Sequence, residues 1–305
     1  MWFFCLFVQI NRFGELMNII ILIPVFNDFK STSKLIEEID INIADLDASF
    51  SIIVINDAST EEKTLEMNNL NNIKSLKLIN MKKNRGHARC IAAGLKYISE
   101  NEEFDCVIPM DGDGEDRPEE IKNFLERIKT NPNRSIVGER VKRSEGTIFK
   151  ICYFIHKLIT YTFTGKFIKF GNFTCLSKET VKKLINEKAT WSSFSGSLVK
   201  IEQNLTKSPS IRGPRYFGPS KMSFLNLVKH SLAIIAVFKS AVIFRSIAFY
   251  ALYLIIIADY INIITAIPLA LIIIFGITIL KISGRENLTE FNNSLLNIQR
   301  IDKLI

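Results

Sequence analysis

The chain has 305 residues, of which 48% are hydrophobic, and its formal net charge at pH 7 is +8. This length accommodates one sizeable α/β domain plus an additional segment. The apolar excess lies mainly after residue 246, while basic residues concentrate in residues 139–169 and 201–245. Such basic stretches suit phosphate groups or an anionic membrane surface, with a merely solvated basic face as the simpler alternative.

Five cysteines and three histidines are too few, and too scattered, for a disulfide framework or a zinc site. None of the cysteines forms a CxxC pair, and their spacing fits a reducing compartment. Residues 1–16 are apolar at first but lack a basic n-region and a cleavage site. We treat them as an uncertain N-terminal extension rather than a signal peptide.

Short apolar runs alternate with helical patterns over the first half of the chain. The runs predict strands at residues 18–24, 50–55, 75–80, 104–109 and 135–137. Helical periodicity begins at Ser31, covers residues 87–98, and resumes over residues 118–129 with proline in the first turn. This alternation predicts a mostly parallel, Rossmann-like sheet flanked by helices, with ligands beyond the carboxyl ends of its strands.

The C-terminal third has a different character. Residues 222–239 mix apolar positions with basic ones and predict an amphipathic helix in the plane of the lipid headgroups. Residues 240–258 and 261–280 are apolar runs of membrane-spanning length, separated by Asp259. Basic residues flank both outer ends, which favours a hairpin with both ends in the cytoplasm over a single span or a buried soluble pair.

The sequence Asp111-Gly112-Asp113 follows a predicted buried strand and carries the clearest chemical signal. Two carboxylates one residue apart on a turn offer hard oxygen ligands to Mg²⁺ or Mn²⁺, which would bridge to a nucleotide diphosphate. The cation would then act as a Lewis acid on the leaving group. A solvated loop is the simpler alternative, but the position at a strand end favours the metal site.

Three further polar clusters fall at predicted strand ends, at residues 27–28, 56–57 and 84–86. Asp57 is placed to accept a hydrogen bond from a base or ribose, or to cap the helix that follows it. Arg85 is placed to meet phosphate, and His87 is either catalytic or, as we favour, a structural residue at a helix start. No GxGxxG opens a helix, which disfavours an NAD-type site.

Taken in order, these clusters resemble those of family 2 glycosyltransferases, which have the GT-A fold. The resemblance rests on residues 23–28, 54–59, 84–95 and 110–119 and covers roughly residues 18–240. It is closest to the dolichyl- and undecaprenyl-phosphate sugar transferases. Residues 212–221 resemble the R..G.SK segment that leads into a membrane helix in that subgroup, and the hairpin matches it too.

The resemblance implies a role for individual residues. Nucleotide-sugar binding is expected at Pro24, Asn27, Asp28, Asp57, Arg85, Gly86 and Asp111. Metal binding is expected at Asp111 and Asp113, with Glu115 and Asp116 as further catalytic candidates. Donor or acceptor phosphate is expected at Arg140, Arg212, Arg215, Ser220 and Lys221. Arginine and lysine suit this work because both are permanent donors to phosphate oxygens.

Departures from the family pattern bear on the mechanism. Asp28 stands where the family usually has Glu, Asn56 replaces the first of two acids, and Asn172 lies where many relatives have an acidic segment. The absence of a QxxRW motif disfavours a processive polysaccharide synthase. A sugar-hydroxyl acceptor needs a carboxylate base, whereas a phosphate is already an anionic nucleophile, so the pattern favours polyprenyl phosphate unless Glu115 or Asp116 is the base.

We therefore expect an inverting, metal-dependent hexosyltransferase that moves a sugar from a UDP- or GDP-sugar to a polyprenyl phosphate at the cytoplasmic face of the inner membrane. The expected parts are the extension at 1–16, a GT-A catalytic domain at 17–221, an amphipathic juxtamembrane helix at 222–239, a transmembrane hairpin at 240–281 and a cytoplasmic tail at 282–305 with a short helix. The alternatives are a same-fold transferase acting on a lipid-linked or envelope saccharide, and a non-catalytic membrane scaffold. No nucleic-acid partner is expected, and a homo-oligomer is left open.

Overall fold

The computed structural model describes residues 16–61, 64–142, 147–219 and 224–305. The strands are β1 Asn18–Val25, β2 Ser49–Asn56, β3 Ile73–Met81, β4 Cys106–Pro109, β5 Ile136–Lys142, β6 Thr174–Ser177, β7 Thr206–Ile211 and β8 Ile298–Lys303. The α-helices are α2 Phe29–Asn42, α3 His87–Asn101, α4 Ile121–Thr130, α5 Thr147–Thr164, α6 Lys178–Asn186, α7 Phe194–Ile201, α8 Phe224–Ala236, α9 Lys239–Ile256, α10 Ile263–Ser283 and α11 Leu288–Asn292. Short 3₁₀ turns are η1 Pro118–Glu120, η2 Lys188–Trp191, η3 Ala258–Tyr260 and η4 Ser294–Asn297.

Within the described residues, these strands form one sheet in the order β7-β5-β6-β4-β1-β2-β3-β8. The four central strands, β4, β1, β2 and β3, are parallel to one another. Strand β6 runs antiparallel to β4 and β5, and β8 runs antiparallel to β3. The five predicted strands are all present, and the apolar pattern did not predict β6, β7 and β8. Two of these, β6 and β8, run antiparallel to their neighbours and make the sheet mixed.

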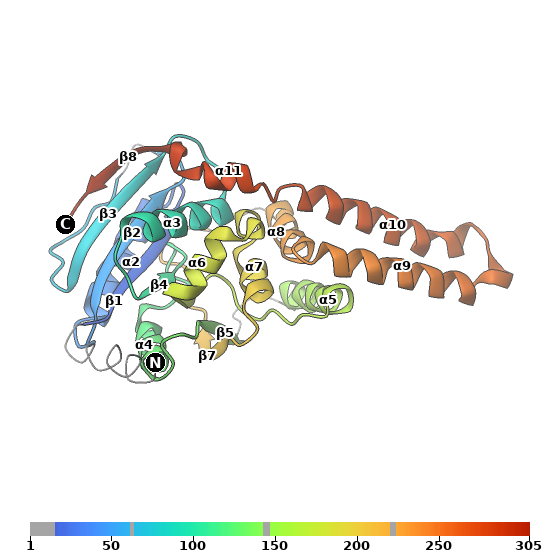
Figure 1. The fold of residues 1–305 in the computed structure, drawn as a ribbon, viewed down its shortest axis with the longest axis horizontal. Coiled ribbons are helices and arrows are strands. Elements are labelled where there is room, and N and C mark those ends of the chain that lie inside the picture. The colour runs from blue at the N-terminus through green and yellow to red at the C-terminus, as the bar shows by residue number, and fades with distance from the viewer. Residues whose placement is uncertain (1–15, 62–63, 143–146, 220–223) are drawn as a thin grey trace, which may run out of the picture.

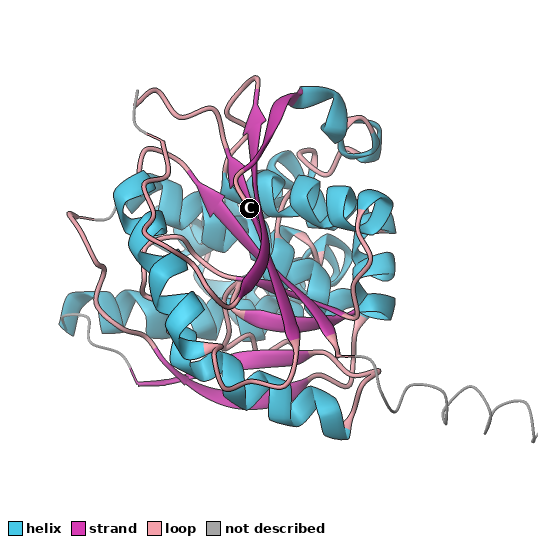
Figure 2. Cartoon of the chain, turned by 90° about the vertical axis from the view of Figure 1, so that its left-hand side faces the viewer, coloured by secondary structure: helices cyan, strands magenta, loops and turns pink. Residues whose placement is uncertain are grey.

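Helices cover both faces of the twisted sheet (Figure 2). Alternation along β1 explains why both faces are apolar: Ile19, Ile21 and Ile23 point into one core cluster, and Ile20 and Leu22 point into the other. The first cluster includes side chains of α2 and α4, and the second includes side chains of α3, α6 and α7. Burial on both faces is the reason that the central strands read as continuous apolar runs.

Helices α9 and α10 extend from the α/β body as an antiparallel pair (Figure 1). Helix α10 has 21 residues, which at about 1.5 Å per residue is close to the roughly 30 Å of a bilayer core. Only 11% of the apolar window in each helix is buried. A buried helical pair of a soluble protein would show the opposite, so the low burial favours the predicted hairpin over that alternative.

The turn and base of the hairpin are fixed by polar contacts. Asn262 and Thr265 form a capping box at the start of α10, directly after η3. At the base, Arg245 donates to the carbonyl oxygens of Tyr161 and Thr162 at 3.2 and 2.9 Å. These carbonyls belong to the last turn of α5, where a cation is favourable. The basic residue therefore ties the hairpin to α5.

The segment beyond the hairpin contains the short helix that the sequence predicts, α11, but it does not end as a free tail. The chain returns to the α/β body, and β8 adds to the outer edge of β3, with Leu78 opposite Asp302 and Ile79 opposite Ile301 (Figure 1). Polar residues on this strand obscure the pattern, because β8 is an edge strand with mostly exposed side chains.

Candidate active site

The Asp111–Asp113 turn follows the carboxyl end of β4. It lies next to the carboxyl end of β1 and the first turn of α2. The backbone N–H of Asp111 donates to Asp116 at 3.0 Å, and that of Glu115 donates to Asp113 at 3.0 Å. Gly114 has a φ of +85°, which a glycine adopts without strain. The carboxylates of Asp113 and Asp116 thus stabilise the turn by accepting its backbone N–H groups, and the Asp116 side chain is buried.

Two arginines from the segment after β7 reach into this turn. Arg215 donates to Asp113 at 2.5 Å and to Asp28 at 2.6 Å. Arg212 donates to Glu115, and its guanidinium lies 4.0 Å from Asp111. Backbone bonds from Gly213 to Glu115 and from Tyr216 to Asp113 hold the two segments together. Two of the expected phosphate-site residues, Arg212 and Arg215, therefore cluster with the two expected metal-site aspartates.

Each of these arginines retains a buried N–H group with no acceptor. The Nε atoms of Arg212 and Arg215 are buried and make no hydrogen bond within the described part of the chain. A buried, unpaired donor is unfavourable unless a ligand supplies its acceptor. Two such donors beside a cluster of carboxylates fit a phosphate-bearing ligand.

His87 and Asn172 approach one carboxylate oxygen of Asp111, Oδ1, while Arg212 lies nearer the other, Oδ2. Asn172 Nδ2 donates to Asp111 Oδ1 at 3.0 Å, and His87 Nε2 lies 3.2 Å from the same oxygen. Burial lowers the pKa of His87, but the hydrogen bond and charge of Asp111 outweigh it, and the pKa is raised overall. Burial alone would raise the pKa of Asp111, and these contacts hold it well below its usual range. Asp111 is therefore a fixed carboxylate.

The pKa values of the neighbouring acids Asp113 and Asp116 are raised by burial and by this concentration of negative charge. Burial and the charge of Asp111 raise the pKa of Asp113 to about 6 and that of Asp116 to about 7. Two close carboxylates with such repulsion fit a divalent cation, which would relieve it. The described residues contain no group of three or more metal-binding side chains, so a cation here would take its other ligands from substrate or water.

A second polar group forms where β2 and β3 end. The buried carboxylate of Asp57 accepts hydrogen bonds from the N–H groups of Arg85 and Gly86, both at 2.8 Å. Asp57 therefore ties the start of α3, rather than capping the segment directly after itself. Asn27 and Ala58 hold positive φ angles of 51° and 55° in the adjoining turns. Such backbone strain is typical of ligand-binding sites.

Comparison with known proteins identifies the family of the chain. Residues 20–181, more than half of the chain, match the family described as glycosyl transferase family 2. The chain belongs to glycosyltransferase family 2. The matched region contains the Asp111–Asp113 turn and both residues of the Asp57–Arg85 contact.

Curated relatives of this glycosyltransferase include two enzymes named undecaprenyl-phosphate 4-deoxy-4-formamido-L-arabinose transferase. That of Klebsiella pneumoniae (strain 342) is 25% identical over 223 residues, which is 68% of this chain and 63% of the relative. That of Salmonella choleraesuis (strain SC-B67) is 25% identical over 217 residues, with the same coverage. The glycosyltransferase thus spans less than two thirds of the length of these relatives.

Solved structures show the same fold. Glucosyl-3-phosphoglycerate synthase from Mycobacterium tuberculosis, in complex with Mn²⁺, UDP and glucosyl-3-phosphoglycerate, superposes with a TM-score of 0.53. The similarity covers 74% of this chain and 80% of that one, at 12% identity. The same enzyme with Mn²⁺, UDP-glucose and glycerol 3-phosphate gives a TM-score of 0.51 at the same identity and coverage. This glycosyltransferase therefore has the GT-A fold.

The remaining expected site residues are placed as follows. Pro24 lies at the end of β1, and its carbonyl oxygen lies against Gly112. Arg140, on β5, lies against Gly171, and its charge opposes the rise in the pKa of Asp116. Arg85 donates to Glu290 of α11 at 2.8 Å, a partner that the sequence did not predict. Ser220 and Lys221 lie outside the described residues of the glycosyltransferase.

Several residues of the site were missed or undervalued by sequence reasoning. Asn172 was noted only as a departure from an acidic pattern, and Glu290 sits in a tail with no motif. His230, on α8, interacts electrostatically with His87 and Asp111, and burial together with the charge of His87 lowers its pKa to about 4. Only the three-dimensional fold brings α8 of this glycosyltransferase to the acidic cluster.

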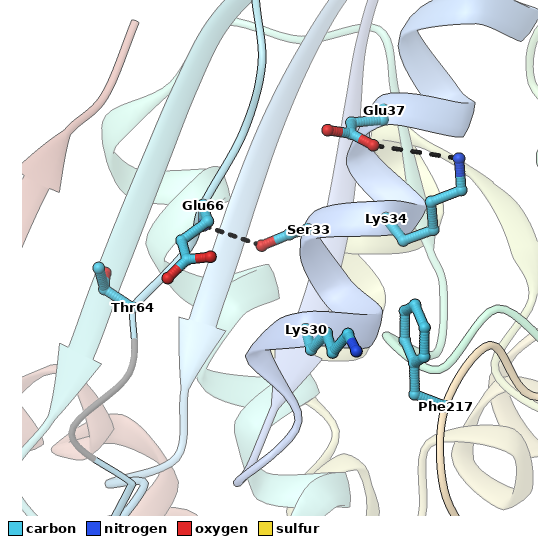
Figure 3. A pocket seen from close by; sticks show the side chains of 7 residues that line it. All are labelled: Lys30, Ser33, Lys34, Glu37, Thr64, Glu66 and Phe217. Atoms are coloured by element: carbon cyan, nitrogen blue, oxygen red, sulfur yellow. Dashed lines mark hydrogen bonds and ion pairs between the residues drawn. The ribbon is translucent and has the colours of Figure 1, made fainter.

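A separate pocket of about 330 Å³ opens between α2 and the segment after β2 (Figure 3). Its lining residues are Lys30, Ser33, Lys34, Glu37, Thr64, Glu66 and Phe217. None of these is an expected site residue, and Lys34 is already paired with Glu38 at 2.8 Å. We therefore assign this pocket no part in the chemistry of the glycosyltransferase.

Proposed function

We propose that this glycosyltransferase moves a sugar, with inversion, from a UDP- or GDP-sugar to a polyprenyl phosphate at the cytoplasmic face of the membrane. The main support for this proposal is the contact of Arg212 and Arg215 with the turn at residues 111–115. These arginines lie in the segment that leads to α8 and the hairpin, so one short stretch of chain connects the acidic cluster to the apolar helices. The names of the curated relatives support a polyprenyl-phosphate acceptor.

On the donor side, the proposal assigns the nucleotide to the ends of β1, β2 and β3. Asn27, Asp57, Arg85 and Gly86 line this edge, and their loops are bound to one another. Asn27 accepts a hydrogen bond from the N–H of Thr60 at 2.8 Å and so fixes the turn after β2. The base and ribose would lie against these loops, with the diphosphate directed toward Asp111.

A divalent cation, Mg²⁺ or Mn²⁺, held by Asp111 and Asp113 would supply Lewis-acid stabilisation of the departing diphosphate. The protein's own contribution is positional. His87 and Asn172 fix Asp111, and the guanidinium groups of Arg212 and Arg215 place donors beside the leaving group. Fixed donors and charges of this kind supply much of the rate enhancement in transfer reactions.

On the acceptor side, we assign no carboxylate base for a sugar hydroxyl, because both candidates already have partners in the protein. Glu115 is held by Arg212, and Asp116 is buried and accepts the N–H of Asp111. A phosphate oxygen needs no base: it forms a bond to the anomeric carbon while the bond from that carbon to the donor phosphate oxygen breaks, releasing nucleoside diphosphate. Arg140, Arg212 and Arg215, with Ser220 and Lys221, are the proposed phosphate contacts.

The membrane assignment also rests on α5. This helix packs against α8 and α9, and its apolar side chains Phe154, Ile155 and Leu158 are 63%, 48% and 55% exposed. The helix also contains Lys150 and Lys157, and Lys166 and Lys169 follow it in the chain. An exposed apolar face with basic residues, placed at the base of the hairpin, is typical of a helix that lies in the headgroup plane. We propose a multi-pass protein of the cytoplasmic membrane with its α/β domain in the cytoplasm.

The test is incubation of the purified protein with a panel of UDP- and GDP-sugars and undecaprenyl phosphate, with and without Mn²⁺ or Mg²⁺. We expect a sugar-phosphate lipid that mild acid cleaves, and none with undecaprenol as the control acceptor. An acid-stable product that requires a saccharide acceptor would instead favour transfer to a lipid-linked or envelope saccharide. Full cellular function of an Asp111→Asn variant would favour the scaffold role.

A further inference from the structure

The chain beyond the hairpin contacts the donor edge at several points. Helix α11 and turn η4 lie between the hairpin and the sheet, and β8 closes the sheet beside β3 (Figure 1). These elements follow the membrane helices in sequence, yet they contact the loop that enters α3 and Asn80 of β3, which in turn bonds to Asn56 at the end of β2. The contacts fall into three groups, at Glu290, at Asn297 and at Asp302.

Glu290 holds the first turn of α3. Its Oε1 accepts from Arg85 at 2.8 Å, and its Oε2 accepts from Trp191 Nε1 at 3.0 Å and lies 3.4 Å from Arg89. Phe291, which is fully buried, stacks on Trp191 with ring centroids 5.4 Å apart. The Glu290 carboxylate therefore pairs with both Arg85, which precedes α3, and Arg89 in its first turn. The packing of Phe291 on Trp191 holds the helix that carries this carboxylate.

Asn297 and its neighbour hold the loop that enters α3. The N–H of Lys82 donates to the carbonyl of Asn297 at 2.7 Å, and Lys82 Nζ donates to that of Leu296 at 2.9 Å. Asn297 Nδ2 returns a hydrogen bond to the carbonyl of Lys83 at 3.0 Å. The loop is thus bound at Lys82 and Lys83, just before the Arg85 and Gly86 N–H groups that hold Asp57.

Asp302 begins a chain of side-chain hydrogen bonds that crosses two strands. Asp302 accepts from Asn80 at 2.8 Å, and Asn80 accepts from Asn56 at 2.8 Å. Asn56 in turn accepts the N–H of Ser59 at 2.9 Å, and Ser59 accepts the N–H of Asn27 at 2.9 Å. This path ends in the two turns that hold the positive φ angles.

We propose that the segment after the hairpin is a positioning element of the donor site, with Glu290 setting the Arg85 loop and Asp302 setting the Asn56 turn. Neither residue touches the reacting atoms. Both act through residues that the proposed function assigns to the nucleotide, and the inference rests on that function. The geometry of the proposed nucleotide site would then depend on α11, η4 and β8, which follow the hairpin in the sequence.

The experiment compares the full-length protein in detergent with Glu290→Gln and Asp302→Ala. The matched controls are Glu179→Gln, which removes the charge from an exposed pair with Lys183, and Gln299→Ala on the exposed face of β8. The probes are UDP and GDP with Mn²⁺, measured by calorimetry. Kinetics with the active nucleotide-sugar and undecaprenyl phosphate give the KM of each substrate.

Loss of a hydrogen bond to a charged group should weaken nucleotide binding by about tenfold in Glu290→Gln, with a matching rise in donor KM. Asp302→Ala should shift the same constants in the same direction. The kcat and the KM for undecaprenyl phosphate should stay within about twofold of wild type, because the positioning contacts do not reach the acceptor side. A role in sheet stability alone would lower the melting temperature without this selective change.

Unchanged or tighter nucleotide binding in both variants, with a wild-type protein that binds and transfers, would overturn the inference and leave the proposed function standing. An equal change in the two controls would overturn it as well. If the wild-type protein binds neither UDP nor GDP and transfers no sugar from the panel, the proposed function fails, and the inference fails with it.

Discussion

Arg215 joins two acidic side chains that are far apart in sequence, donating to Asp113 at 2.5 Å and to Asp28 at 2.6 Å. Asp113 lies at the end of β4, and Asp28 precedes α2. Because the guanidinium is planar and forked, it bridges the two carboxylates with separate nitrogens. The arginine thereby links the segment that leads to the apolar helices α8, α9 and α10 with both the Asp111–Asp113 turn and Asp28 at the start of α2.

Replacement of Arg215 by Ala should reduce kcat/KM by about 100-fold, since it removes a fixed cation from the cluster. Arg215→Lys should recover little of this loss, because one ammonium cannot make both contacts. Steady-state kinetics measure the effect. Arg127→Ala, an exposed arginine on α4, is the control and should retain activity. Activity of Arg215→Lys close to wild type would contradict the bridging role.

Removal of divalent cations should abolish transfer. Chelation with EDTA is expected to stop turnover, and added Mn²⁺ or Mg²⁺ should restore it, because the two aspartates alone repel each other and leave the diphosphate charge uncompensated. The variants Asp111→Asn and Asp113→Asn should lose activity by about 1,000-fold or more at any cation concentration. Complete turnover in chelator would refute the metal assignment.

Gly114 and Gly218 allow a matched test of how the turn is packed. Both have positive φ, at 85° and 64°, but a Cβ on Gly114 would meet the ring of Tyr216, whereas one on Gly218 would meet nothing within 4 Å. Gly218→Ala should cost about 1 kcal/mol from backbone strain. Gly114→Ala should cost about 2–4 kcal/mol and reduce activity, because overpacking adds to that strain. Thermal unfolding in detergent gives both values, and equal losses would contradict the contact.

The central sheet could be predicted because burial on both faces leaves a simple mark in the sequence. Residues 19–25 of β1 are an uninterrupted apolar run, and residues 52–55 form a second such run in β2, which ends at the polar residue Asn56. Strands β6 and β8 could not be predicted in the same way. The first, with the sequence Thr-Cys-Leu-Ser, has only two apolar residues, and the second is an exposed edge whose partner, β3, precedes it by more than 200 residues.

The candidate site could be predicted only where residues fall directly after strands. Asp57 and Asp111 are of this kind, and their positions follow from the common edge of a parallel sheet. The other residues of the site arrive through tertiary contacts: Asn172 lies in the loop before β6, His230 lies on α8, and Glu290 lies beyond the hairpin. No local pattern marks such residues, because the requirement that they meet is set by the fold.

If the hairpin spans the membrane, a charge in the middle of α10 should disfavour insertion, whereas the same charge on the α/β domain should not. Ile273 lies near the middle of α10 and is 48% exposed. Ile273→Arg should disfavour insertion by about 3 kcal/mol, the scale of a charge at the centre of a spanning helix. The measurement is the fraction of protein that stays in the membrane pellet after an alkaline carbonate wash, and we expect that fraction to fall.

The control is Ile41→Arg, which places the same charge at a 66% exposed position on α2. Because α2 lies in the domain assigned to the cytoplasm, this variant should remain in the pellet like wild type. A cysteine placed at Tyr260 should react with an impermeant maleimide only from the far side of the membrane, and one at Ile305 only from the cytoplasmic side. Labelling of both from the same side, or an unchanged pellet for Ile273→Arg, would rule out the two-span arrangement.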